Sequence, residues 1–141
     1  MLTPLTEARN ISELLKNAKT IAVVGLSDDP SRTSYGVSRY MQSQGYRIIP
    51  VNPNETEVLG QKAYPSLEAV PEKVDLVDVF RRSEATPPIA EQAVRIGAKG
   101  LWLQQGVWSD EAAATAKAGG LTVVMDLCIA VMHTLLALPR K

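Results

Sequence analysis

The chain has 141 residues, of which 45% are hydrophobic and 21% charged, a composition typical of one globular domain with a single core. Fifteen basic residues balance fifteen acidic ones, so charge gives no support to a nucleic-acid or an anionic-membrane partner. One cysteine and one histidine argue against disulfides and structural zinc and favour a reducing cytoplasm. No apolar run approaches the ~18 residues of a membrane span. We expect one cytoplasmic domain over residues 1–141.

Short apolar stretches alternate with helical patterns along the chain. The expected strands cover residues 20–25, 46–51, 74–80, 99–104 and 121–126. The expected helices cover residues 6–17, 35–44, 66–70, 87–96, 110–118 and 128–138. Nearly continuous apolar strands are typical of parallel sheets buried on both faces, and the alternation implies right-handed crossovers. We therefore predict an α/β, Rossmann-like domain with a five-stranded parallel sheet in the order 3-2-1-4-5 and helices on both faces.

Several residues signal where helices begin and end. Thr86 and Ser109 are expected N-caps, and Asp126 is a candidate cap of the last helix. Gly45 and Gly97 follow apolar periodic segments and are expected helix stops.

The loop after the first strand has the composition of an anion site. Ligands of such sheets bind at the carboxyl ends of the strands, and here the first strand runs into "GLSDDPSRTSYG" (residues 25–36). A dinucleotide fingerprint would need glycines two and five residues after Gly25, and these positions hold Ser27 and Pro30. A helix N-terminus with serine hydroxyls and Arg32 nevertheless suits a phosphate. The alternative is a plain solvated loop capped by Ser34.

The end of the second strand argues against NAD. An acidic residue there usually holds the ribose hydroxyls, but "PVNPN" (50–54) places Asn52 and Pro53 at this point, with Glu55 slightly later. A proline-containing turn can border an adenine without charge, and the alternative is an ordinary turn.

Cys128 and His133 do not form an expected catalytic pair. Five residues apart on a helix, they lie about 140° from one another. Cys128 falls on an apolar stripe, where cysteine often acts as a small hydrophobe, and His133 is expected to be a structural residue.

Five motifs in order resemble the small CoA-binding protein family. They are "VVGLSDDPSRTSYGVSRYM", "GYRIIPVNPN", "VDLVDVFRRSE", "GLWLQQGV" and "VMDLCIAVMH". The resemblance covers residues 20–133, and it implies the fold of the N-terminal domain of the succinyl-CoA synthetase alpha subunit and of ADP-forming acyl-CoA synthetases.

The resemblance also implies a role for each loop. The residues nearest the CoA phosphates would be Gly25, Ser27, Arg32, Ser34, Tyr35 and Gly36. Those bordering the adenosine end or flanking the nucleotide would be Asn52, Pro53, Phe80, Arg81, Arg82 and Ser83. The segment "WLQQG", with Gln105 and Gly106, would line the side toward the pantetheine arm, although core packing is the favoured role of Trp102. For Phe80 and the two arginines, core packing and solvation are the open alternatives.

These observations favour a stand-alone protein that binds coenzyme A or an acyl-CoA without chemistry of its own. It would carry or sense the ligand, or regulate a protein partner, and a homodimer is compatible with the sequence. The alternative is a small NAD(P)-dependent oxidoreductase of Rossmann type, against which the broken glycine fingerprint and Asn52 count.

Overall fold

The computed structural model describes the backbone from residue 4 and the side chains from residue 7, in both cases to residue 141. Its main sheet contains five parallel strands, β1 (Thr20–Val24), β2 (Arg47–Val51), β5 (Leu76–Val79), β6 (Gly100–Leu103) and β7 (Thr122–Val124). The helices are α1 (Pro4–Asn17), α2 (Thr33–Ser43), α3 (Thr86–Arg95), α4 (Asp110–Ala118) and α5 (Ile129–Leu135). A small hairpin of β3 (Glu57–Val58) and β4 (Gln61–Lys62) and 3-10 turns at Leu67–Ala69 and Ser83–Ala85 complete the fold. The α/β prediction is confirmed.

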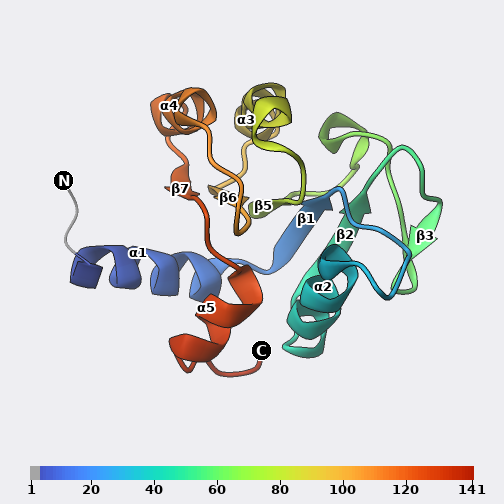
Figure 1. The fold of residues 1–141 in the computed structure, drawn as a ribbon, viewed down its shortest axis with the longest axis horizontal. Coiled ribbons are helices and arrows are strands. Elements are labelled where there is room, and N and C mark those ends of the chain that lie inside the picture. The colour runs from blue at the N-terminus through green and yellow to red at the C-terminus, as the bar shows by residue number, and fades with distance from the viewer. Residues whose placement is uncertain (1–3) are drawn as a thin grey trace.

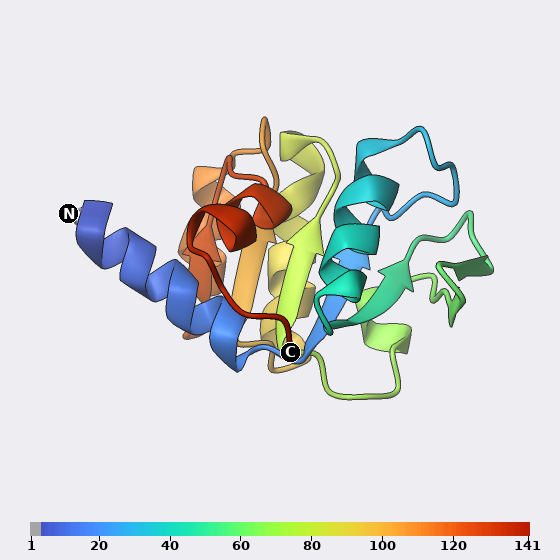
Figure 2. The same cartoon turned by 90° about the horizontal axis from the view of Figure 1, so that it is seen from below.

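Helices cover both faces of the sheet (Figure 1). On one face, α3 and α4 cover a cluster that includes Val77 and Leu103. On the other, α1, α2 and α5 cover a second cluster, in which Leu15 and Trp102 are fully buried. Figure 2 shows α5 lying between α1 and α2 over this second face. Two separate apolar layers thus hold the strands from both sides, which is why the strands read as continuous apolar runs.

The predicted strand order was wrong. The order is β2-β1-β5-β6-β7, so the third main strand pairs with β1 and β2 lies at the edge. The reason lies in Pro50 of β2, which has no N–H to donate to a further strand. Its carbonyl accepts a hydrogen bond from Tyr64 N (3.0 Å), and Tyr64 O accepts one from Asn52 N (2.9 Å). An irregular segment therefore covers the edge that a third strand would have needed.

The helix boundaries were predicted with mixed success. Ser109 is the N-cap of α4, where its side chain accepts a hydrogen bond from Ala112 N. Gly45 and Gly97 follow their helices with φ of +96° and +76°. Thr86 is the first residue of α3 rather than its cap. Cys128 is the N-cap of α5, not Asp126.

No helix of residues 4–141 is long and apolar enough to cross a membrane.

Candidate functional site

The strand order of the sheet reverses between the neighbouring strands β1 and β5. The carboxyl ends of these two strands lie side by side at this point. From β1 the chain moves to β2 on one side and then returns to β5 on the other. Gly25, directly after β1, has φ +90°. A Cβ on this residue would collide with the carbonyl oxygen of Phe80 and lie 3.3 Å from Nε of Arg81. The absence of a side chain at Gly25 therefore permits the close approach of three predicted site residues at the point where such sheets bind ligands.

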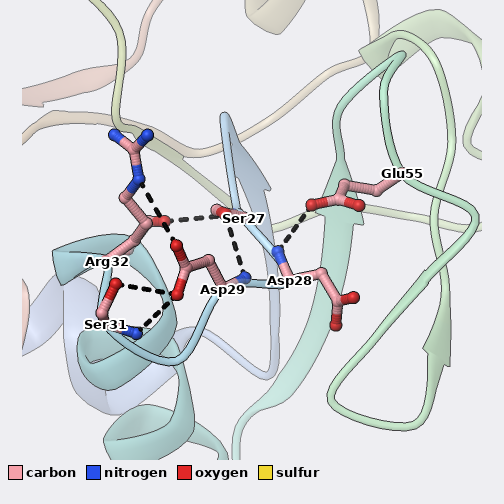
Figure 3. A network of polar contacts seen from close by, with 7 residues as sticks. Ser27, Asp28, Asp29, Ser31, Arg32 and Glu55 are labelled. Carbon is pink, nitrogen blue, oxygen red and sulfur yellow. Dashed lines mark hydrogen bonds and ion pairs between the residues drawn. The ribbon is translucent and has the colours of Figure 1, made fainter.

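The loop between β1 and α2 is held by its own polar groups (Figure 3). Asp29 N donates to Ser27 Oγ (3.1 Å), and Ser31 donates to Asp29 Oδ1 from both its amide (2.9 Å) and its hydroxyl (2.8 Å). Asp28 N donates to Glu55 Oε2 at 2.6 Å, which ties the loop to the segment after β2. Figure 3 shows the Asp28 carboxylate pointing away from Arg32.

Arg32 is the N-cap of α2, and its side chain makes no capping hydrogen bond. The side chain is 73% exposed and lies 3.9 Å from Asp29. The hydrogen bonds donated by the backbone and hydroxyl of Ser31, together with the charge of Arg32, hold the pKa of Asp29 below its usual value. Tyr35 N and Gly36 N donate to Arg32 O (3.1 and 3.4 Å). The first amides of a helix have no intrahelical partner, so this end of α2 presents the N–H groups of Thr33 and Ser34, without a side-chain cap, next to an exposed guanidinium.

The next three candidate residues lie inside α2 and differ in accessibility. Ser34 is buried, and its Oγ accepts a hydrogen bond from Ser27 N at 3.1 Å. The N-cap of α2 is Arg32, so Ser34 is not the cap that the alternative interpretation assigned to it. Tyr35 is half-buried and packs against the core. Gly36 is exposed, with open space where a Cβ would point. Ser34 therefore shapes the loop, whereas Gly36 leaves its surface accessible.

After β2, most of the candidate polar side chains form hydrogen bonds with other groups of the protein. Asn52 is buried, its Nδ2 donates to Leu26 O (3.1 Å), and its Oδ1 accepts from Asn54 N (3.0 Å). Pro53 is exposed. Asn52 and Pro53 carry no carboxylate, and Glu55, a little later, accepts a hydrogen bond from the amide of Asp28. The end of β2 thus differs from NAD sites, in which an acidic residue directly after the strand holds the ribose.

The remaining candidates lie on the loops after β5 and β6. Arg82 is exposed, whereas Arg81 is half-buried. Ser83 Oγ accepts a hydrogen bond from Trp108 N at 3.0 Å, so the two loops contact each other. Gln105 and Gly106 are exposed, and Gly106 N donates to Asp126 Oδ1 at 2.7 Å. Asp126 thus anchors the loop after β6 instead of capping α5.

One buried polar pair was missed by the sequence analysis. Asp78, in β5, is 1% exposed, and its Oδ1 accepts a hydrogen bond from Gln104 Nε2 at 2.6 Å. Burial raises the pKa of Asp78 to about 7. The signal was an acidic residue inside the apolar stretch "VDLVDVF", which a strand buried on both faces does not ordinarily contain.

The structural interpretation of His133 is confirmed. It is buried, and its Nδ1 lies 2.9 Å from the hydroxyl of Tyr40 on α2. Burial, and then the charge of Lys141, lowers the pKa of His133.

Trp102 is likewise a core residue, and its Nε1 donates to Leu127 O at 2.7 Å. Cys128 is half-buried and unbonded to another cysteine. Among residues 4–141, no cluster of three or more His, Cys, Asp or Glu residues is arranged to hold a metal ion.

Two cavities lie beside other parts of the sheet, the second of them reaching the loops after β6 and β7. One of about 410 Å³ is lined by residues such as Asn17, Asp75 and Lys99, at the amino ends of the strands. A larger one of about 850 Å³ runs along β7 between α1 and α4 and is bordered by Trp108 and Leu127. Neither is lined by the loop between β1 and α2.

Comparison with known proteins places the chain in a family. The model of a "CoA binding domain" matches residues 19–134. The chain is 52% identical over 123 residues to the Bacillus subtilis "Uncharacterized protein YneT", covering 87% of this chain and 91% of that protein. A solved structure of a hypothetical protein from Pyrococcus horikoshii shares 38% identity with a TM-score of 0.90, covering 96% of this chain and 93% of that one.

A more distant similarity links the chain to a larger enzyme. It is 29% identical over 129 residues to the alpha subunit of the ADP-forming acetate–CoA ligase II of Pyrococcus furiosus. The match covers 84% of this chain but 28% of that subunit. The family resemblance drawn from the sequence motifs is confirmed: the chain belongs to the family of small Rossmann-type CoA-binding domains.

Proposed function

We propose that the protein binds coenzyme A or an acyl-CoA as a carrier, sensor or regulatory module, with no chemistry of its own. One observation carries the proposal: the uncapped N-terminus of α2, with exposed Arg32, lies on the edge where Gly25 lets β1 approach Phe80 and Arg81 closely. The lone free Cys128 fits a reducing cytoplasm as the setting.

The residues present at this edge suit the chemistry of CoA. Its phosphates are anions, and uncapped helix amides and arginine side chains are favourable partners for them. Gly36 leaves open space beside the first turn of α2, so a bulky phosphate group can approach the backbone. Arg81 and Arg82, after β5, would supply further cations on the nucleotide side, and Gln105 and Gly106 would line the path of the pantetheine arm.

The internal bonds of the site refine the role of each serine. Ser34 Oγ accepts from Ser27 N, and Ser27 Oγ accepts from Asp29 N. Both hydroxyls therefore hold the loop in shape, and each retains its own proton for donation to a phosphate oxygen. Asn52, bonded to Leu26 O and Asn54 N, would fix the wall next to Pro53 rather than contact the ligand through its amide.

The test is a parallel calorimetric titration of the purified protein with CoA, acetyl-CoA, NAD and NADP. Selective binding of the CoA compounds supports the proposal, and the relative affinities of CoA and acetyl-CoA distinguish a free-CoA site from an acyl-CoA site. Binding of NAD or NADP alone would refute it and favour the oxidoreductase alternative.

Variants then locate the phosphate site. The double change Arg32→Ala and Ser34→Ala should weaken CoA binding about a hundredfold or more, since hydrogen bonds to charged groups contribute roughly 1.5–3 kcal/mol each. Arg39→Ala is the matched control, because Arg39 is an exposed arginine on the same helix, two turns from its start. Unchanged affinity in the double variant, with the control also unchanged, would move the phosphate site elsewhere.

A further inference from the structure

The cavity of about 850 Å³ along β7 has no role in the CoA site proposed above. β7 is the edge strand of the sheet, and Figure 1 shows α4 and α1 on either side of it. The volume lies in the range of small-molecule sites. Most of the described residues that line the cavity are apolar, among them Ile11, Ala113, Ala114, Val123, Met125 and Leu127. We call this space the β7 cavity.

Two large apolar side chains are exposed where the β7 cavity reaches the carboxyl edge of the sheet. Trp108, in the loop after β6, is 54% exposed, and Leu127, in the loop after β7, is 36% exposed. The carboxylates beside them bond to the protein, because Asp110 Oδ1 accepts from Trp108 Nε1 (3.0 Å) and Asp126 Oδ1 accepts from Gly106 N (2.7 Å). Exposed apolar side chains that border a hollow often mark a ligand-binding groove.

This end of the β7 cavity lies within reach of the proposed phosphate site. From the loop after β1, the loop after β6 is two strand spacings away, about 10 Å, and the loop after β7 is three, about 14 Å. The pantetheine arm of CoA extends roughly 14 Å from phosphate to sulfur, the length of about four residues of extended main chain. An arm that passes Gln105 and Gly106 therefore brings its sulfur to Trp108 and Leu127, at the opening of the β7 cavity.

We propose that the β7 cavity holds the acyl group of an acyl-CoA, and that the ligand is an acyl-CoA with an apolar chain of several carbons. The inference rests on the proposed function and specifies its ligand. An alkyl chain carries no charge and gains from each methylene that leaves water, which suits an apolar groove within reach of a thioester. Glu7 and Lys117, which also line the cavity, are exposed to solvent, so the chain enters without burying their charges.

Calorimetric titration with CoA, acetyl-CoA, hexanoyl-CoA and octanoyl-CoA tests the inference and separates it from the proposed function. We expect the dissociation constant to fall about two- to fourfold for each methylene beyond the acetyl group, the gain that burial of a methylene provides. Equal affinities for CoA and octanoyl-CoA would overturn the acyl inference and leave CoA binding intact. Failure of every CoA compound to bind would refute both proposals.

A pair of matched variants tests the position of the chain. Ala114→Glu places a carboxylate in the β7 cavity from an exposed position on α4. It should weaken octanoyl-CoA binding about tenfold or more, because an apolar chain beside the new charge would strip it of water, and it should leave CoA binding unchanged. Ala118→Glu is the control, since Ala118 is exposed on the same helix but is not among the residues that line the cavity. Equal losses in the two variants would contradict the assigned position.

Fluorescence locates the chain independently of affinity. The protein has two tryptophans, so Trp102→Phe leaves the exposed Trp108 as the single emitter. Octanoyl-CoA should shift the emission of Trp108 to shorter wavelengths by more than CoA does, because the acyl chain removes water from the ring. Tight binding of octanoyl-CoA with the same emission as in the CoA complex would place the chain elsewhere and overturn the inference.

Discussion

Replacing Asp78 by Asn should remove a large part of the pH dependence of stability. Asp78 is almost fully buried in β5 and accepts a hydrogen bond from Gln104. Burial raises its pKa from 3.8 to about 7, although the hydrogen bonds from Gln104 and from the amide of Val79 act in the opposite direction. In the unfolded chain the same carboxyl loses its proton near its ordinary pKa.

The sign and size of the effect follow from linkage. Between pH 4 and pH 7 the folded protein keeps a proton on Asp78 that the unfolded chain has lost, so the free energy of unfolding falls as pH rises. Each unit of pH between the two pKa values lowers the free energy of unfolding by up to about 1.4 kcal/mol. The interval from 3.8 to about 7 therefore lowers it by about 4 kcal/mol. Asn has nearly the same shape and keeps an oxygen for Gln104, but it does not titrate.

Urea unfolding of the wild type and Asp78→Asn, measured in half-unit steps from pH 4 to pH 8, provides the assay. The stability of the variant relative to the wild type should rise by about 4 kcal/mol across this range. His133, whose lowered pKa makes folded stability fall as pH drops below about 6.5, acts alike in both proteins and cancels in the difference. Two parallel curves would show that Asp78 is already ionised in the folded protein and would refute the reasoning.

Further substitutions at four positions probe the fold and the loop. Gly25→Ala should destabilise the domain by about 2–4 kcal/mol in urea unfolding, because the residue has φ +90° and a Cβ there collides with a carbonyl oxygen. Gly36→Ala, with open space beside it, should be neutral or should stabilise the domain by up to about 1 kcal/mol. Equal effects of the two substitutions on the free energy of unfolding would contradict this account. Trp102→Phe should lower the free energy of unfolding by about 1–3 kcal/mol, since the buried side chain loses its N–H hydrogen bond to a backbone carbonyl. A thermal midpoint equal to that of the wild type would argue against a role for this bond. Ser109→Ala should cost about 1 kcal/mol through loss of the α4 cap, with Ser109→Asp as the variant expected to restore stability.

The local elements were predictable because their signals are local. Each expected strand contains an observed one, and the Ser109 cap and the Gly45 stop lie where the residue types indicate. The failures arose where another backbone group forms a hydrogen bond with the side chain that was expected to cap the helix. Thr86 was expected to cap α3, but its hydroxyl donates to Ser83 O, in the turn before the helix. Asp126 was expected to cap α5, but its carboxylate is taken by the amide of Gly106.

The candidate site was predictable as a set of loops but not as a set of contacts. Parallel strands bring their carboxyl ends to one edge whatever their order, so the loops after β1, β2, β5 and β6 lie at one edge of the sheet. Periodicity does not reveal that the hydroxyl of Ser34 faces inward to Ser27 N or that Asp78 and Gln104 form a buried pair. Those contacts depend on which strands are neighbours, and this is a long-range property.

The position of Phe80 and Arg81 shows how much depends on strand order. In the predicted order 3-2-1-4-5, the strand that ends at Phe80 would be separated from β1 by β2, a distance of two strand spacings or about 10 Å. The observed order makes β5 the direct neighbour of β1, and only the missing side chain of Gly25 lets Phe80 O and Arg81 approach that strand. The direct contact of Gly25 with Phe80 and Arg81 thus depends on the observed order and would be absent from the order derived from the pattern. Pro50, which leaves β2 without a donor on its outer side, is the residue from which the correct order could have been inferred, because it marks β2 as an edge strand and directs the third main strand to the other side of β1.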